Sequence, residues 1–178
     1  MNKPPPTLAD IEKAIRNIPD FPKPGIQFKD ITPVLADPRL FSACVDRLIG
    51  HLKPGAVDAV VGIDARGFIF AAAAALRLHT GLVPVRKQGK LPYLTHEVSY
   101  DLEYGSNTIA IHQDAFRPGS RVLLVDDLLA TGGTAAAAVE LIRKAGGQLV
   151  EISFFIELSF LKGRDKLRPH PVRSLVVY

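Results

Sequence analysis

The chain has 178 residues, 47% of them hydrophobic and 22% charged, a balance that supports a folded core and excludes disorder over most of its length. The net charge of +4 favours anionic partners, but Lys and Arg form no run dense enough to indicate nucleic acid binding. Cys44 is the only cysteine, which excludes an internal disulfide framework, and we expect it to be buried in an apolar helix.

No membrane partner and no export signal are expected. The N-terminus lacks the apolar stretch of a signal peptide, and the longest apolar run, residues 68–76, is too short to span a bilayer. We therefore expect a cytoplasmic protein in which residues 1–178 form a single domain.

The first part of the chain predicts two helices separated by a loop. Thr7 is typical of a helix N-cap, and apolar side chains follow it at helical spacing as far as Ile18. Residues 20–33 are crowded with Pro and Gly and predict a loop. Asp37 followed by Pro38 predicts the start of the second helix.

After Pro54 and Gly55, strands and helices are expected to alternate, which predicts an α/β fold with a parallel sheet and helices on both faces. The polar stretch 88–106 interrupts the alternation and predicts a flexible lid or binding loop, with an exposed hairpin as the alternative. The expected strands are 57–63, 82–85, 107–112, 122–125, 149–156 and 175–177, and the expected helices are 68–78 and 134–145.

The stretch from Val122 to Thr134 carries the most chemistry. A strand buried on both faces is expected to end in Asp126 and Asp127, and a short turn with Gly132 and Gly133 then opens a helix. Backbone N–H groups at such a turn bind an anion, whereas carboxylates suit sugar hydroxyls or a metal. The pattern therefore predicts a site for a ribose 5-phosphate. The alternative is an ordinary turn in which the glycines serve only geometry.

Two further strand ends carry cations. Arg66 follows a strand within a Gly-flanked turn at a helix start, which suits a second phosphate group, although a surface arginine is the alternative. Arg86, Lys87 and Lys90 follow the next strand and could neutralise an anionic leaving group. A solvated edge is the alternative for these three.

Residues 122–134 resemble the 5-phosphoribosyl 1-diphosphate (PRPP) binding signature of type I phosphoribosyltransferases. Residues 21–33, 90–92, 99–105 and 157–164 are similar to the members of that family that act on adenine. The resemblance covers about Phe21 to Leu167. It implies the type I phosphoribosyltransferase fold, in which residues 1–35 form an N-terminal helix and a base-binding hood and residues 88–106 a flexible active-site loop.

The resemblance also implies the reaction of adenine with PRPP to give AMP and diphosphate, with Mg²⁺ held mainly by substrate oxygens and water. Asp126 and Asp127 would contact the ribose hydroxyls and the metal. A cis peptide bond is implied between Asp64 and Ala65. The residues implied for the 5′-phosphate are Ala130, Thr131, Gly132, Gly133 and Thr134, and those implied for the diphosphate are Asp64, Ala65, Arg66, Lys87 and Lys90.

For the base, the resemblance implies that Phe28 stacks on adenine while backbone groups of Gln27 and Lys29 bind its edge. Glu103 would manage the proton at adenine N7, with Tyr104 in the lid. A homodimer is implied as well. Gln27 and Lys29 depart from the commoner family residues, aliphatic and Arg respectively, and Tyr93 has no assigned role.

Three other functions compete with this interpretation. The first is the same reaction on hypoxanthine or guanine, which the hood motif and Glu103 disfavour. The second is a purine-sensing regulator, which would need an added DNA-binding domain, although only about twenty residues precede the hood motif. The third is a nucleotide-binding module without catalysis, which would need neither the lid nor its Glu.

Overall fold

The computed structural model describes residues 4–101 and 106–178, apart from the side chain of Asp101. It divides into two compact units, residues 1–47 and residues 48–178, which are described one at a time. The expected single domain therefore stays a prediction. Within the described ranges, no helix is both long enough and apolar enough to cross a membrane.

The first unit opens with helix α1 (Leu8–Ala14), which starts where the sequence predicts. The Thr7 hydroxyl accepts a hydrogen bond from the Asp10 backbone N–H, and the Asp10 carboxylate accepts one from the Thr7 backbone N–H. This reciprocal cap satisfies two donors that a helix start otherwise leaves unpaired. The predicted continuation of the helix to Ile18 is wrong, because strand β1 (Arg16–Pro19) follows almost at once.

Strand β1 pairs antiparallel with strand β2 (Gln27–Asp30), which lies in the stretch predicted as a loop. The prediction failed because the strands are only four residues each and are stabilised by one another, which no local pattern reveals. In the turn between them, the Gly25 N–H donates to the Asp20 carboxylate over 2.7 Å. Helix α2 (Thr32–Ala36) follows the hairpin.

Helix α3 (Pro38–Ile49) begins as predicted, because the Asp37 carboxylate accepts hydrogen bonds from the backbone N–H groups of Arg39 and Leu40. Cys44 is fully buried on this helix, as expected. Burial raises the pKa of its thiol to about 12. The cysteine therefore serves as a small apolar side chain.

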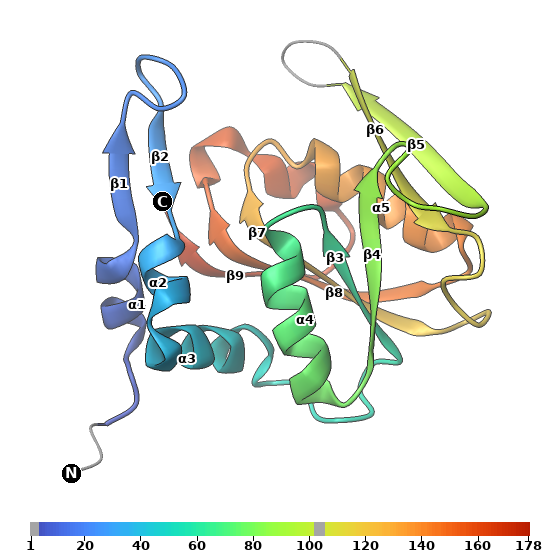
Figure 1. Ribbon diagram of the computed structural model, residues 1–178, viewed down its shortest axis with the longest axis horizontal. Coiled ribbons are helices and arrows are strands. Elements are labelled where there is room, and N and C mark those ends of the chain that lie inside the picture. Colours follow the sequence, from blue (N-terminus) through green and yellow to red (C-terminus); the bar gives the residue numbers. More distant parts are fainter. Residues whose placement is uncertain (1–3, 102–105) are drawn as a thin grey trace. The chain divides into compact units, whose positions relative to one another are not determined.

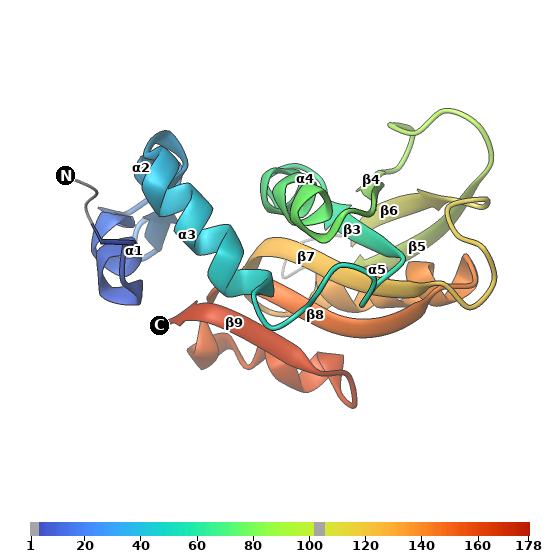
Figure 2. The ribbon, with the colours of Figure 1, turned by 90° about the horizontal axis from the view of Figure 1, so that it is seen from below.

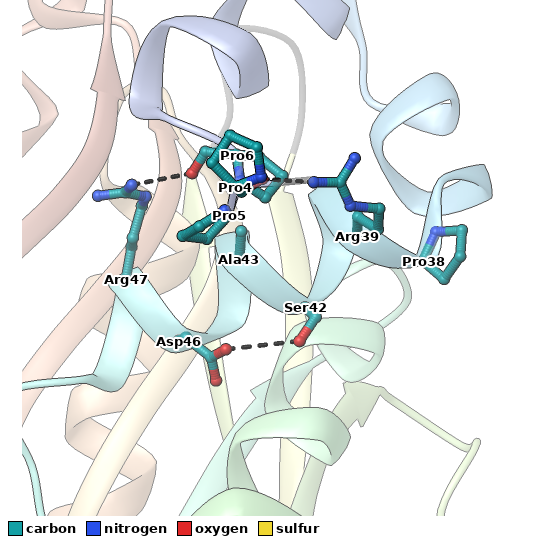
Figure 3. Close-up of a pocket in the computed structure, with 9 residues that line it drawn as sticks. All are labelled: Pro4, Pro5, Pro6, Pro38, Arg39, Ser42, Ala43, Asp46 and Arg47. Atoms are coloured by element: carbon teal, nitrogen blue, oxygen red, sulfur yellow. Dashed lines mark hydrogen bonds between the residues drawn. The ribbon is translucent and has the colours of Figure 1, made fainter. Parts of the chain in front are cut away.

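The proline-rich segment that precedes α1 lies along α3 in Figure 3. Arg39 donates a hydrogen bond to the Pro4 carbonyl, and Arg47 donates one to the Pro6 carbonyl over 2.9 Å. Between the segment and the helix lies a depression of about 830 Å³. The segment is thus hydrogen-bonded to α3 rather than detached from the first unit.

The second unit is built on a seven-stranded sheet with the order β5-β6-β4-β3-β7-β8-β9. The neighbours from β4 to β9 are parallel, whereas β6 runs antiparallel to both β4 and β5. Figure 2 shows β8 and β9 side by side at one edge of the sheet. The strands are β3 (Ala59–Ile63), β4 (Gly81–Lys87), β5 (Thr95–Asp101), β6 (Ser106–His112), β7 (Arg121–Leu129), β8 (Gln148–Glu157) and β9 (Val172–Val177).

The expected parallel sheet core is confirmed, and at one edge β5 and β6 add an antiparallel hairpin to it. Strand β5 lies inside the stretch 88–106 that the sequence predicts as a loop, and it pairs with β6 from Thr95 opposite His112 onward. The alternative prediction for this stretch, a hairpin, is correct for residues 95–101, which pair with β6. Antiparallel neighbours need only a short connection, so the sequence lacks the helix-length segment that would otherwise mark where one strand ends and the next begins.

Helices α4 (Gly67–Leu78) and α5 (Gly133–Lys144) cover opposite faces of this sheet (Figure 1). Val61 of β3 belongs to the hydrophobic cluster that contains the buried side chains of α5. A Cβ added at Gly62, the next residue, would lie 2.7 Å from Ala71 of α4. Successive residues of β3 thus face different helices, and this explains why the strand is apolar throughout.

Candidate active site

The acid pair lies where strand β7 passes its shorter neighbour. The pairing of β3 with β7 ends at Val125, whereas β8 pairs with β7 as far as Leu129. The prediction that the strand ends before the acids is therefore wrong, since β8 continues to support it. Asp126 and Asp127 follow Val125 directly, at the carboxyl end of β3, which is the end where open α/β sheets bind ligands.

Arg66 joins the acid pair to the start of helix α4. Its Nε–H donates to the Asp127 carboxylate over 2.6 Å, and the Asp127 residue is 8% exposed. The Asp126 carboxylate in turn accepts the Asp127 backbone N–H at 2.9 Å. Two strand ends that the sequence analysis treated separately are thus parts of one cluster.

The close approach of α4 to the acids depends on Gly67. A Cβ at this position would lie 2.5 Å from the Asp126 carboxylate oxygen, so any larger residue would displace one of them. The positive end of the helix dipole therefore comes close to a carboxylate. Burial nevertheless raises the pKa of Asp126 well above its ordinary value, and the Asp127 charge raises it further. Burial also raises the pKa of Asp127, although Arg66 opposes this.

The small-residue loop after β7 adopts a conformation that requires glycine. Gly132 is the N-cap of α5 with φ +78°, and no side chain caps the helix there. A Cβ on Gly132 would lie 2.3 Å from the carbonyl oxygen of Gly163, and a Cβ on Gly163 would lie 2.1 Å from that of Ala130. The backbone of the loop therefore packs directly against the backbone of the segment after β8, and this contact restricts the shape of the loop.

An ion-pair network holds that supporting segment. Gly163 opens the short 3₁₀ helix η2 (Gly163–Leu167), and the next residue, Arg164, donates from Nε to Glu157 over 3.1 Å. The guanidinium also donates to the Val172 carbonyl at 2.7 Å, while the Ser174 hydroxyl donates to Glu157. These hydrogen bonds, that from Arg164 above all, lower the pKa of Glu157. Sequence reasoning noted the run 157–164 as a resemblance but missed its contact with the loop.

Strand β4 continues beyond its predicted end at residue 85, so Arg86 and Lys87 are its last two residues and only Lys90 follows it. The three cations are used in different ways. Arg86 donates from Nε to Asp64 over 3.1 Å and from a terminal nitrogen to the Lys90 carbonyl at 2.9 Å, so it braces the turn that follows β3. Lys87 and Lys90 are exposed, and neither side chain forms an ion pair with another residue in the described part of the chain. The cis peptide bond between Asp64 and Ala65 is present, as the resemblance implied.

The residues expected to bind the base fall in the first unit. Gln27, Phe28 and Lys29 lie on β2, where the Gln27 side chain accepts a hydrogen bond from Asn17 at 2.6 Å. The Phe28 ring meets that of Phe21 edge to face, with 5.1 Å between centroids. Their expected role stays a prediction.

The expected catalytic Glu103 and lid residue Tyr104 lie outside the described residues. Tyr93 is described, and its ring is largely exposed. Sequence reasoning also missed Tyr100 of β5, whose hydroxyl accepts a hydrogen bond from Thr134 of the loop at 2.9 Å. Alternation along β5 could have placed Tyr100 on the buried face with Val98, but not its partner.

The donor set fits a magnesium ion bound mainly by a substrate. Among residues 4–101 and 106–178, no group of three or more His, Cys, Asp or Glu side chains could hold a metal by itself. The acid pair offers carboxylate oxygens, which Mg²⁺ prefers, alongside substrate phosphates and water. A metal carried in by a phosphorylated substrate therefore suits these residues better than a resident metal.

Together these features define a class of protein. A glycine-rich loop at a helix start, an acid pair and a guanidinium meet at the carboxyl edge of a mostly parallel sheet. The helix start suits a phosphate group, and the acids suit the hydroxyls of a ribose. The second unit thus has the arrangement of a protein that binds a phosphorylated ribose.

Comparison with known proteins narrows this class. The model of the phosphoribosyl transferase domain matches residues 38–174. The chain is 58% identical to the adenine phosphoribosyltransferase of Chloroflexus aurantiacus over 172 residues, 97% of this chain and 99% of the relative. The crystal structure of the adenine phosphoribosyltransferase of Rhodothermus marinus superposes with a TM-score of 0.91 at 49% identity, covering 96% of this chain and 98% of that one.

The enzyme of Saccharomyces cerevisiae, whose crystal structure holds an imino-altritol 1,6-bisphosphate and adenine, has a TM-score of 0.87 at 40% identity. The match covers 94% of this chain and 97% of the yeast chain. The chain therefore belongs to the phosphoribosyltransferase family and, within it, to the adenine phosphoribosyltransferases.

Proposed function

We propose that the chain transfers ribose 5-phosphate from PRPP to adenine, giving AMP and diphosphate. The observation that carries the proposal is the Asp127–Arg66 pair beside the glycine loop, which offers groups for a ribose, for its phosphate and for an anionic leaving group. The yeast relative supports it, because that structure contains adenine together with a bisphosphate.

In the proposed complex, the loop of Ala130, Thr131, Gly132, Gly133 and Thr134 binds the 5′-phosphate through its backbone N–H groups and hydroxyls. Asp126 and Asp127 accept hydrogen bonds from the ribose hydroxyls. The residues assigned to the diphosphate are Asp64, Ala65, Arg66, Lys87 and Lys90. The exposure of Lys87 and Lys90 leaves both ammonium groups accessible to a ligand.

During transfer, adenine N9 forms a bond to C1′ while the bond from C1′ to the diphosphate oxygen breaks and the diphosphate leaves with the electron pair. Positive charge builds on the sugar, and the acid pair is placed to stabilise it. Cationic side chains stabilise the negative charge on the leaving diphosphate. We assign to Glu103 the proton at adenine N7, which must leave as the new bond forms. Tyr104 would help to exclude water that could otherwise attack C1′.

For the base itself, we assign Phe28 to stacking on adenine and the backbone of Gln27 and Lys29 to its polar edge. An aromatic face suits any purine, so the backbone groups must supply the selectivity. Recognition through the backbone is compatible with the departures at Gln27 and Lys29, because those groups do not depend on the side chain.

We also propose that Mg²⁺ accompanies PRPP, with Asp126 or Asp127 as its protein contacts, directly or through water. When bound, the ion neutralises part of the diphosphate charge. That the chain works in the cytoplasm, without nucleic acid or membrane, stays a prediction from its sequence.

A homodimer is the proposed assembly. Ile69 and Leu76 lie seven residues apart on α4 and are 39% and 80% exposed, and Leu82 of β4 is 40% exposed. In the proposed dimer, these side chains are part of one apolar surface that another copy of the chain covers. Light scattering at micromolar concentration should give the mass of a dimer. A fully active monomer would contradict the proposal.

The transfer is tested by incubating the purified protein with PRPP, Mg²⁺ and adenine and separating the products. We expect AMP and diphosphate in equal amounts, and loss of both when EDTA removes the metal. Diphosphate release without AMP would mean that water, and not adenine, accepts the ribose, and the proposed base site would then be wrong.

A further inference from the structure

Strand β5 contacts the glycine loop through Tyr100. The Thr134 hydroxyl donates a hydrogen bond to the Tyr100 hydroxyl over 2.9 Å, and Thr134 is the second residue of α5. The Tyr100 ring is partly buried and packs on the hydrophobic cluster beneath α5. Val98, two residues earlier on the same face of the strand, belongs to that cluster. The phenol is therefore held at the loop by its own packing.

A threonine hydroxyl has one proton to donate and can accept hydrogen bonds from others. In the structure Thr134 is assigned as the donor of this hydrogen bond to Tyr100. A phosphate oxygen is a charged acceptor and forms the stronger hydrogen bond, so Thr134 would donate to phosphate when a phosphate binds. The Tyr100 hydroxyl, which is itself a donor, could then donate to Thr134. The result is a chain from Tyr100 through Thr134 to phosphate, in which each hydrogen bond polarises the next.

We propose that Tyr100 is a positioning residue for the phosphate group of the nucleotide. Its hydroxyl orients the Thr134 hydroxyl toward the 5′-phosphate and strengthens that hydrogen bond without contacting the ligand. The inference rests on the proposed function, because it takes the loop to bind the 5′-phosphate of PRPP and AMP. It assigns a role in substrate binding to the hairpin at the edge of the sheet.

The test is the affinity of Tyr100→Phe for AMP and for adenosine, measured by calorimetry on the purified protein. The substitution keeps the ring and removes only the hydroxyl. We expect AMP to bind more weakly by about three- to tenfold, the scale of one hydrogen bond, and adenosine to bind as before. A purely structural role would weaken both ligands alike, and that result would overturn the proposal.

A double-mutant cycle of Tyr100 with Thr134 tests whether Tyr100 acts through the Thr134 hydroxyl. Once Thr134→Val has removed the intermediate hydroxyl, adding Tyr100→Phe should cost no further AMP affinity. In Thr134→Ser, which keeps a hydroxyl, the effect of Tyr100→Phe should persist. Additive losses in the valine background would show that Tyr100 acts by another route and would overturn the assignment.

Ser99→Ala is the matched control. Ser99 precedes Tyr100, and its hydroxyl pairs with that of Thr108 at 2.8 Å within the same hairpin. Removing this hydroxyl should leave the ratio of AMP to adenosine affinity unchanged. If the unaltered protein binds neither AMP nor ribose 5-phosphate, the proposed function itself fails. If it binds both and Tyr100→Phe leaves their affinities unchanged, only the role of Tyr100 fails.

Discussion

At the scale of single residues, the site places two carboxylates with different surroundings side by side. Asp127 has Arg66 as its partner, whereas Asp126 accepts the Asp127 backbone N–H and lies against the start of α4. Burial raises the pKa of both. Buried carboxylates cost stability, and this cost is consistent with the functional role that we propose for the pair.

The Asp127 charge should matter more to the transition state than to the bound product. Asp127→Asn keeps the shape but removes the charge that we propose stabilises the developing positive sugar. We expect a turnover number lower by about ten- to a hundredfold, with a smaller change in AMP affinity. Steady-state kinetics and AMP titration measure the two effects. Asp165→Asn, which alters an exposed pair with Arg168, is the control and should change neither. An unaffected turnover number would mean that the acids serve only the turn.

The raised pKa of Asp126 gives its stability effect a definite sign. The folded state binds the Asp126 proton more tightly than the unfolded chain does. The protonated carboxyl therefore stabilises the fold fully at pH values below the ordinary pKa of 3.8, and this contribution is lost as pH rises through the raised pKa. Asp126→Asn should therefore raise the melting temperature at neutral pH, by roughly 2–4 °C for each kcal/mol gained. The gain should disappear near pH 4.

Asp58 has a lowered pKa, so its effect on the melting temperature should depend on pH in the opposite direction. Its hydrogen bonds with Arg121 lower its pKa to about 2, so its contribution is present at neutral pH and is lost as pH falls. Asp58→Asn should lower the melting temperature at neutral pH. A melting temperature of Asp126→Asn that parallels that of the unaltered protein at every pH would show that the Asp126 charge has no such cost.

Glu103 is tested through the contrast between two substitutions. Glu103→Leu should leave PRPP binding nearly intact, because the phosphate groups are assigned to other strand ends. It should lower the turnover number strongly, since the N7 proton loses its acceptor. Glu103→Gln should be milder, because the amide still makes a hydrogen bond. Weaker PRPP binding with unchanged turnover in Glu103→Leu would instead place Glu103 at the diphosphate or the metal.

At the scale of elements, the glycine loop takes its shape from a neighbouring segment. Gly163→Ala would bring a Cβ within 2.1 Å of the Ala130 carbonyl oxygen, so the loop must move. We expect the KM for PRPP to rise by about tenfold or more and stability to fall by about 1–3 kcal/mol, as in other overpacked sites. Gly81→Ala is the control, because nothing lies within 4 Å of its added Cβ. Normal PRPP kinetics in Gly163→Ala would show that this contact does not set the loop.

Some of the helices and strands could be predicted from the sequence and others could not. Helices α3 and α5 and the apolar strands were predictable because periodicity, caps and turn residues are local signals, as at Asp37 before α3 and Gly132 before α5. The hairpins β1–β2 and β5–β6 were missed in part, since short polar strands are stabilised by partners that local pattern does not reveal. The contact between Gly132 and Gly163 joins segments on either side of β8 and depends on the tertiary structure.

The same distinction holds for the site. Asp126, Asp127 and the loop could be identified because they form one continuous run. That Arg66 pairs with Asp127, while Arg86 pairs with Asp64, could not be predicted, because each pair joins two different strand ends. The residue types that the chemistry needs are visible in the sequence, whereas the sheet determines which of them lie in contact.

At the scale of the whole molecule, the account assigns different tasks to the two units. The second unit holds the acid pair and the glycine loop, and the first holds the hairpin with Phe28. The phosphoribosyl part of the reaction is assigned to the second unit and the choice of base to the first. The choice of adenine as the base therefore rests on the first unit alone.

The most direct measurement is nucleotide formation from PRPP and Mg²⁺ with adenine, guanine and hypoxanthine in turn, each followed to its kcat/KM. The account predicts rapid formation of AMP from adenine and no comparable product from the other two bases. Equal turnover of guanine would contradict the assignment of Gln27, Phe28 and Lys29 to adenine. Absence of product with all three bases would contradict the proposed reaction itself.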